Sequence, residues 1–126
     1  MDEGRALFLQ IAESVEDSII DGSLAPESRA PSTNELAAFY RINPATAAKG
    51  IALLVDKGVL YKRRGIGMFV APDAYDLLLG ERRARFATGY IDPLLAEARR
   101  LSLSGDELAD LIRARAADTP TEGNTP

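Results

Sequence analysis

The chain has 126 residues, of which 46% are hydrophobic and 27% are charged, and its formal net charge is −4. This length and apolar content fit one compact domain, or a small domain with an appendage, and exclude a largely disordered chain. The absence of cysteine and histidine removes disulfides, thiol nucleophiles, imidazole bases and the usual zinc ligands. No apolar run approaches the roughly 20 residues of a membrane helix, and the start lacks a signal-peptide pattern, so we expect a cytoplasmic protein without membrane association.

Charge is distributed unevenly along the chain. Residues 1–35 carry two cations and eight anions, residues 36–72 six cations and one anion, and residues 73–126 seven cations and ten anions. Only the middle segment is basic. Because the Debye length is about 8 Å at physiological salt, a local basic patch can act while distant carboxylates are screened. Charge alone leaves two interpretations open: an anion-binding surface, or a solvated cluster of basic residues.

The first predicted element is an amphipathic helix within residues 6–24, ended by Gly22. Its apolar stripe comprises Leu7, Phe8, Ile11, Val15 and Ile19. The acidic residues Glu13, Glu16 and Asp17 have the spacing of its solvent face. The segment that follows, "SLAPESRAP", contains two prolines and is predicted to be a connecting loop.

Two further helices are predicted from their start signals. Ser32 and Glu35 have the spacing of a capping box, which begins a short second helix. Asn43 can cap a third helix with Pro44 at its first position, where the missing N–H costs nothing. This third helix ends near Gly58. Gly50 inside it costs up to ~1 kcal/mol relative to alanine, which suggests that another helix passes close by.

The next stretch, "VLYKRRGIGMFV", has two β-prone runs separated by a glycine-containing turn, and is predicted to form a two-stranded hairpin. The order helix, helix, tight turn, helix, hairpin is that of a winged helix-turn-helix. After Pro72, one long helical pattern continues to about residue 101, with Pro93 as a kink or restart. Ser104 and Glu107 form a second capping box before a last short helix.

The predicted fold is therefore mainly α with a small β-hairpin. We expect a winged helix-turn-helix domain over residues 1–72, a two-helix dimerisation region over 73–117 and a disordered tail over 118–126. The helices after Pro72 carry an apolar stripe with too few local partners, which favours a second copy of the chain, although folding back onto the winged domain is an alternative. The expected dimer contacts are Phe86, Tyr90, Leu94, Ala98, Leu101, Leu108, Leu111 and Ile112.

Polar residues at the start of the third helix are candidates for contact with DNA. The first turns of a recognition helix face the major groove, where Asn43, Thr46 and Lys49 would meet base edges or phosphates. Each also has a simpler interpretation, as a helix cap, a first-turn hydroxyl and a solvated charge. Ser32 is ambiguous in the same way, because a helix N-terminus attracts phosphate while capping alone explains the serine.

The hairpin carries the more informative pattern. Lys62, Arg63 and Arg64 precede its turn and could follow a DNA backbone or enter the minor groove. Gly65 and Gly67 have no Cβ and would let the main chain approach the sugar–phosphate wall closely. The alternative is a hairpin whose charged residues serve solubility. An enzyme is not expected, because catalysis without histidine or cysteine would need carboxylate pairs, lysine or tyrosine, and nothing in the sequence converges on a nucleophile.

Residues 6–71 resemble the amino-terminal domain of GntR-type bacterial transcription regulators. The resemblance rests on "LFLQIAESVEDSIIDGSLAPESRAPSTNELA", "INPATAAK" and "GVLYKRRGIGMFV", in the family's order and spacing. The wing and the short segment "EARRLSLSGDELADLI" are most similar to the YtrA branch. By this resemblance Thr46, Lys49, Arg63, Arg64 and Gly67 are expected near DNA. Asn34 stands where the family usually has a DNA-contacting arginine, and Glu27 where it has glycine.

The resemblance implies a homodimeric repressor that binds double-stranded DNA at an inverted repeat, often one that controls genes of ABC-type membrane transporters. Two alternatives remain open. One is a winged helix that binds protein in place of DNA, which Asn34 and the acidic first helix favour. The other is a sensor that binds a small-molecule effector between its terminal helices. No cofactor is expected in any of the three cases.

Overall fold

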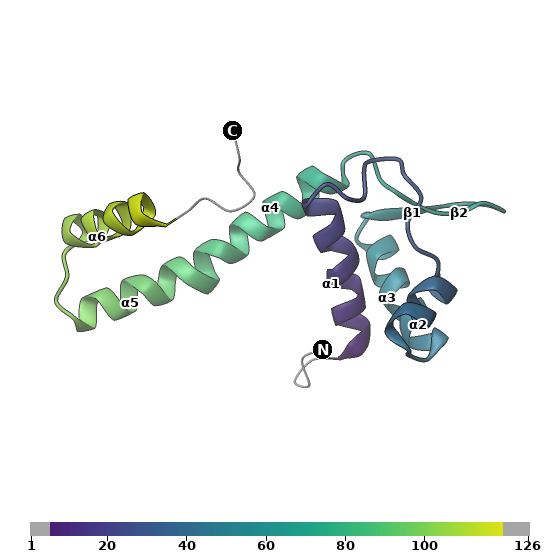
Figure 1. Ribbon diagram of the computed structural model, residues 1–126, viewed down its shortest axis with the longest axis horizontal. Coiled ribbons are helices and arrows are strands. Elements are labelled where there is room, and N and C mark those ends of the chain that lie inside the picture. The colour runs from purple at the N-terminus through teal and green to yellow at the C-terminus, as the bar shows by residue number, and fades with distance from the viewer. Residues whose placement is uncertain (1–5, 120–126) are drawn as a thin grey trace. The chain divides into compact units, whose positions relative to one another are not determined.

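The computed structural model describes residues 6–119 of a chain that divides into two compact units, residues 1–82 and residues 83–126. The amino-terminal unit consists of three helices, a hairpin and the first turns of a fourth helix (Figure 1). Its elements are α1 (Leu7–Ile20), α2 (Thr33–Tyr40), α3 (Pro44–Asp56), β1 (Leu60–Arg63), β2 (Gly67–Val70) and the start of α4 (Ala74–Phe86). This is the winged helix-turn-helix order that the sequence predicts.

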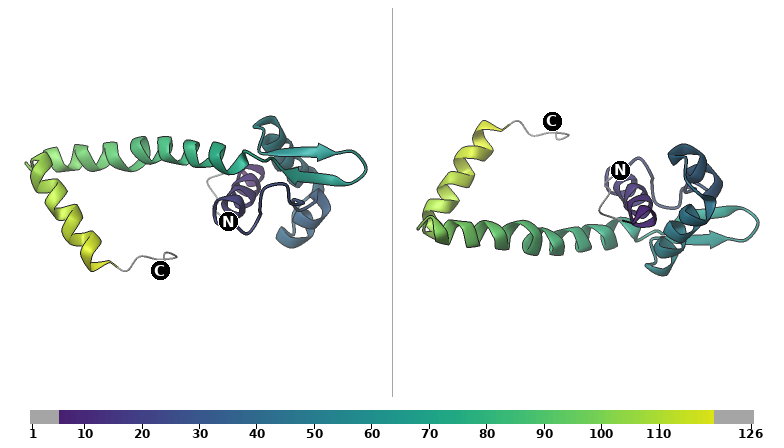
Figure 2. Two further views of the ribbon diagram at one scale, coloured as in Figure 1. Left: turned by 90° about the horizontal axis from the view of Figure 1, so that it is seen from above. Right: turned by 90° about the horizontal axis from the view of Figure 1, so that it is seen from below.

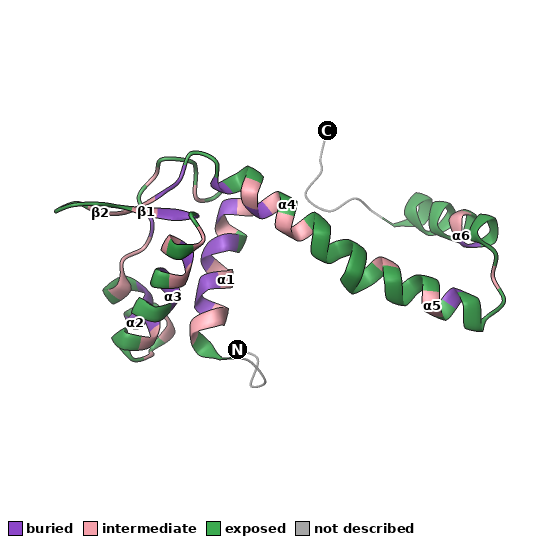
Figure 3. Ribbon diagram, turned by 180° about the vertical axis from the view of Figure 1, so that it is seen from behind, coloured by how far each residue is buried: buried purple, intermediate pink, exposed green. Residues whose placement is uncertain are grey.

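The core of the amino-terminal unit receives apolar side chains from its helices and both strands (Figure 3). Ala74 and Leu78 of α4 belong to this core. Residues 73–82 therefore belong to the amino-terminal unit, beyond the boundary expected at residue 72. The largest fully buried side chains are those of Ile11, Leu54, Val59, Leu60, Val70 and Leu78.

The helix starts are those predicted from the capping residues. The Ser32 hydroxyl accepts a hydrogen bond from the Glu35 amide at 3.0 Å, and the Glu35 carboxylate accepts one from the Ser32 amide at 2.9 Å. The Asn43 side-chain oxygen accepts from the Ala45 amide at 2.8 Å, with Pro44 at the start of α3. Both predicted caps are confirmed, and they fix where α2 and α3 begin.

Gly50 marks the crossing of α1 and α3, as its position inside a helix suggests. A Cβ atom added there would lie 2.9 Å from the Phe8 carbonyl oxygen and 3.4 Å from the side chain of Ile11. Real Cβ atoms do not approach an oxygen so closely, so only glycine lets the two backbones pack at this distance.

The hairpin forms the predicted two-stranded sheet, and a segment from before α2 pairs with one of its edges. β1 and β2 pair antiparallel with Tyr61 opposite Phe69 and Lys62 opposite Met68. Residues 27–30 then run along the free edge of β2. The Glu27 amide donates to the Val70 carbonyl at 2.9 Å, and the Ala30 amide donates to the Met68 carbonyl at 2.8 Å. The segment predicted to be a connecting loop is thus tied to the edge of the hairpin by backbone hydrogen bonds and an isolated bridge.

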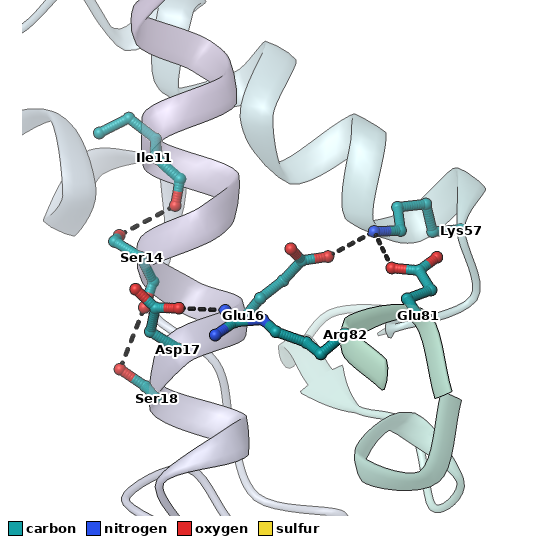
Figure 4. Close-up of polar contacts among 8 residues, drawn as sticks. All are labelled: Ile11, Ser14, Glu16, Asp17, Ser18, Lys57, Glu81 and Arg82. Atoms are coloured by element: carbon teal, nitrogen blue, oxygen red, sulfur yellow. Dashed lines mark hydrogen bonds and ion pairs between the residues drawn. The ribbon is translucent and has the colours of Figure 1, made fainter. Parts of the chain in front are cut away.

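A polar network fastens α4 to α1 and to the end of α3 (Figure 4). The Lys57 ammonium donates to the Glu16 carboxylate at 2.6 Å and to the Glu81 carboxylate at 2.9 Å. Arg82 donates to Asp17 beside it. Glu16 is buried, so the sequence-based expectation that it lies on a solvent face is wrong. The cause is α4, which covers this part of α1.

The carboxy-terminal unit is helical throughout most of its described length. η1 (Ala87–Ile91) is a π-helical turn that leads into α5 (Asp92–Arg100), and the Asp92 amide donates to the Ala87 carbonyl five residues earlier. Pro93 lies in the first turn of α5, so the restart predicted at the proline takes the form of a π-helical turn. α6 (Gly105–Asp118) begins at the predicted Ser104–Glu107 capping box. Of the predicted tail, residues 120–126 lie outside the described residues.

Candidate nucleic-acid interface

All nine predicted DNA-contacting residues lie in the amino-terminal unit, on α2, on α3 and in the hairpin. Asn34 is exposed in the first turn of α2. Ser32 precedes it, and its hydroxyl is engaged in the capping box. The hydrogen bond from the Ser32 amide holds the pKa of Glu35 below its ordinary value. A carboxylate therefore already satisfies one amide at this helix start, which reduces its attraction for phosphate.

The start of α3 presents Asn43, Thr46 and Lys49 on one side of the helix. Asn43 and Lys49 are exposed, and Thr46 is half-buried. The Lys49 ammonium lies 4.2 Å from the centre of the Phe8 ring, a cation–π distance. Thr46 and Lys49 also line a shallow hollow of about 490 Å³ together with the first residues of α1. The sequence predicts the lysine but not the aromatic ring that supports it.

The cations of the hairpin differ in their surroundings. Lys62 lies opposite Met68, which packs on the core, so its side chain leaves the sheet on the face turned toward the helices. Arg63 leaves on the other face. Arg64 follows in the turn, where Gly65 has a φ of +78° that favours glycine. The hairpin tip projects past the three helices (Figure 2).

Arg63 is held by side chains from two segments. Its guanidinium donates to the Glu27 carboxylate at 3.1 Å and to the Tyr61 hydroxyl at 2.8 Å. The same group lies 4.2 Å from the centre of the Phe69 ring, and the Tyr61 hydroxyl donates to Glu27. We name Glu27, Tyr61, Arg63 and Phe69 the wing cluster. The sequence predicts an exposed cation here but not the carboxylate paired with it, because Glu27 lies 36 residues away.

The space beside Gly67 is filled by another side chain of the same protein. A Cβ added to it would lie 3.3 Å from Nε of Arg29, and its φ is +140°. The side chain next to Gly67 is thus that of Arg29, a residue that forms an isolated β-bridge with Phe69. Arg29 is exposed and is a further cation beside the wing, one that no motif in the sequence indicates.

The expected dimer contacts form a mostly apolar surface on the carboxy-terminal unit. Ala98 and Leu108 are buried between α5 and α6, while Leu101 is 61% and Leu111 is 51% exposed. A groove of about 600 Å³ runs over this surface. Phe86 and Tyr90 lie outside the groove, with their ring centres 5.7 Å apart and both rings exposed. The groove is lined by Leu94, Glu97, Ala98, Leu101, Leu103, Leu108, Leu111, Ile112, Arg115, Ala116 and Thr119.

Residues 7–70 match the family model described as bacterial regulatory proteins, gntR family. The match covers the whole helix–hairpin arrangement described above and half of the chain. The chain belongs to the GntR family. It is therefore related to transcription regulators that carry a DNA-binding winged helix. Among residues 6–119, no helix is long and apolar enough to cross a membrane, and no group of three or more acidic side chains could hold a metal ion.

Two Bacillus subtilis relatives are similar to this GntR protein over most of their length. The uncharacterised regulator YhcF is 25% identical over 119 residues, which span 94% of this chain and 93% of YhcF. The transcriptional repressor YtrA is 24% identical over 112 residues, 89% of this chain and 85% of YtrA. The expected kinship with YtrA is confirmed.

Solved structures extend the comparison to both units. A GntR-family regulator from Bacteroides thetaiotaomicron is 29% identical, with a TM-score of 0.75 over 90% of this chain and 98% of the other. The DNA-binding domain of AraR, crystallised in complex with its operator ORX1, is 32% identical. Its TM-score is 0.51, over 56% of this chain and 87% of the AraR domain. The GntR winged helix is thus the fold of the amino-terminal unit.

Proposed function

We propose that the chain is a homodimeric repressor that binds an inverted-repeat operator in double-stranded DNA. The observation that carries the proposal is the winged-helix unit with exposed cations on α3 and on the hairpin. Similarity to the AraR domain, which was crystallised with an operator, supports DNA as the ligand. Similarity to the repressor YtrA supports repression, and the YtrA-like wing and tail support transporter genes as the targets.

In the proposed complex, α3 enters the major groove. Its exposed side chains there are Asn43 and Lys49, and Thr46 can meet a phosphate or a thymine methyl group. The Phe8 ring holds the Lys49 ammonium beside α1. The lysine is therefore partly ordered before binding and loses less conformational entropy when it contacts DNA. Ser32 and Asn34 face the backbone from the start of α2. Arg63, Arg64, Gly65 and Gly67 form the wing, beside the minor groove.

The second copy of the chain is proposed to cover the groove between α5 and α6. Its lining includes leucines that are about half exposed in the single chain, an unfavourable arrangement in water. One winged helix makes only a few phosphate contacts and binds weakly, whereas two linked copies gain roughly 10²- to 10⁴-fold. The size and apolar lining of the same groove also support a second candidate, an apolar effector bound in it.

Selection of bound sequences from random duplex DNA tests the proposal. We expect a palindromic consensus whose half-sites lie about one helical turn apart. The Lys49→Ala variant should lose enrichment at the positions that α3 contacts, while Arg99→Ala, an exposed cation on α5, should retain it. Absence of any enriched sequence would contradict operator binding and favour the winged helix that binds protein. A consensus without symmetry would contradict the dimer.

A further inference from the structure

Glu27 adopts a backbone conformation that disfavours its residue type. Its φ is +66°, in the left-handed region that glycine occupies without penalty. Such a conformation persists only where surrounding contacts hold it. Here the contacts are the amide hydrogen bond to Val70 and the carboxylate contacts with Arg63 and Tyr61. The backbone thus places a full negative charge against the wing.

That charge lies on one specific cation of the wing. The Arg63 guanidinium is 3.1 Å from the Glu27 carboxylate, and its Cζ lies 4.2 Å from the centre of the Phe69 ring. Among residues 6–119, neither Lys62 nor Arg64 has a carboxylate within ion-pair distance. Two of the three wing cations are therefore open to phosphate, and the third is already paired.

A phosphate that approaches Arg63 must share it with Glu27. Both carry negative charge, and at the separation imposed by one guanidinium they repel each other. If Glu27 stays in place, the phosphate binds the remaining N–H groups of Arg63 against this repulsion. If Glu27 turns away, its contacts with Arg63 and Tyr61 are lost. In either case part of the attraction between Arg63 and DNA is lost. Fewer counterions are also released, because the guanidinium charge is compensated before DNA arrives.

We infer that Glu27 is an affinity-determining residue of the DNA site, which competes with the DNA backbone for Arg63. The inference rests on the proposed function and deepens it. Glu27 keeps the sequence-independent affinity of the wing low, so that binding depends more on the contacts of α3. If Glu27 instead oriented Arg63 for a phosphate, removal of the carboxylate would weaken DNA binding, whereas competition predicts that removal strengthens it.

The test measures binding of the full chain to a fluorescein-labelled duplex of random sequence, about 30 base pairs long, which accommodates two half-sites one turn apart. The variants are Glu27→Gln, which keeps the shape, and Glu27→Gly, which removes the side chain and suits the backbone. The control is Asp56→Asn, which removes the same charge from the last turn of α3, outside the wing cluster. Circular-dichroism melting of each variant verifies that it is folded.

Glu27→Gly should bind about two- to fivefold more tightly than the wild type, the range of an exposed ion pair. Its plot of log Kobs against log salt should be steeper by up to about 0.9, one phosphate contact. Glu27→Gln should change the affinity and the salt slope in the same direction. Asp56→Asn should increase both by less than either Glu27 variant does. Arg63→Ala should weaken the Glu27→Gly protein more than it weakens the wild type, because Glu27 no longer masks the arginine.

Equal or weaker binding by Glu27→Gly, in a protein that melts cooperatively, overturns the inference. So does an Arg63→Ala effect that is the same with and without Glu27. Both results leave the proposed function intact, because the wild type still binds the duplex. Failure of every variant, wild type included, to bind the duplex at low salt overturns the proposed function and the role of Glu27 with it.

Discussion

The Lys57 ammonium lies 2.6 Å from the carboxylate of Glu16, which is only 4% exposed and is the one buried charged residue within residues 6–119. A buried carboxylate without a partner is costly, so Lys57 is what allows α4 to cover this point of α1. Burial alone would lower the pKa of Lys57, but its hydrogen bonds to Glu16 and Glu81 outweigh burial and raise the pKa above its ordinary value. The stabilisation is therefore complete at neutral pH and is lost only as the pH rises through the raised value.

Lys57→Met should lower the free energy of unfolding by about 2–4 kcal/mol, because it leaves the Glu16 carboxylate buried and unpaired. Urea unfolding followed by circular dichroism measures it. Combining Glu16→Met with Lys57→Met should recover most of the loss, since an apolar pair needs no charge compensation. Glu81→Gln is the matched control and should cost less than about 1 kcal/mol, because Glu81 is partly exposed. A Lys57→Met protein as stable as the wild type would show that water already solvates Glu16.

Gly50→Ala and Gly80→Ala form a matched pair with opposite expected signs. Both glycines lie inside helices, where alanine gains up to ~1 kcal/mol in helix propensity. At Gly50 the new Cβ would meet the Phe8 carbonyl oxygen at 2.9 Å, so α1 and α3 must separate, which costs about 1–3 kcal/mol. At Gly80 nothing lies within 4 Å, and the propensity gain should remain. The melting temperature should therefore fall for Gly50→Ala and rise for Gly80→Ala. If both variants melted at a higher temperature than the wild type, the close crossing of α1 and α3 would not be the reason for a glycine at position 50.

Local signals in the sequence are enough to predict the elements of this fold. Ser32 with Glu35, Asn43 with Pro44, and Ser104 with Glu107 each act within three residues, and each fixes a helix start as predicted. Gly50 is also predictable, because a glycine inside a helix needs a reason. These signals depend on the backbone of a single turn, which tertiary packing does not override here.

The features that the sequence hides depend on contacts between distant segments. Glu27 meets Arg63 only because residues 27–30 pair with the free edge of β2, and nothing in the alternation of "PESR" indicates a strand. Glu16 has the spacing of a solvent face on α1 and is buried only because α4 returns to cover it. Gly67 is predicted to allow a close approach because it has no Cβ, and nothing in the sequence indicates that the side chain next to it is that of Arg29. Identifying such partners requires the packed structure.

Arg64→Ala should weaken binding to random-sequence duplex and reduce the slope of log Kobs against log salt by about 0.9, the value for one phosphate contact. Arg64 is exposed in the hairpin turn and, among the described residues, has no carboxylate partner to lose. Arg113→Ala, which removes the same charge from α6 in the carboxy-terminal unit, is the control and should leave the slope unchanged. Fluorescence anisotropy at several salt concentrations measures both. An unchanged slope for Arg64→Ala would exclude Arg64 as a backbone contact of the wing.

Leu101→Glu should convert the proposed dimer to a monomer. Leu101 is 61% exposed in the single chain and lines the groove between α5 and α6, so a carboxylate there is tolerated in the monomer but must be desolvated beneath a second copy. Arg99→Glu, in the last turn of α5 but outside the groove lining, is the control and should remain dimeric. Sedimentation equilibrium measures the mass of each protein, and circular dichroism verifies its helices. Operator affinity should fall by roughly 10²- to 10⁴-fold with the loss of the second winged helix. A Leu101→Glu protein that sediments as a dimer would place the interface elsewhere and leave the groove open for an effector.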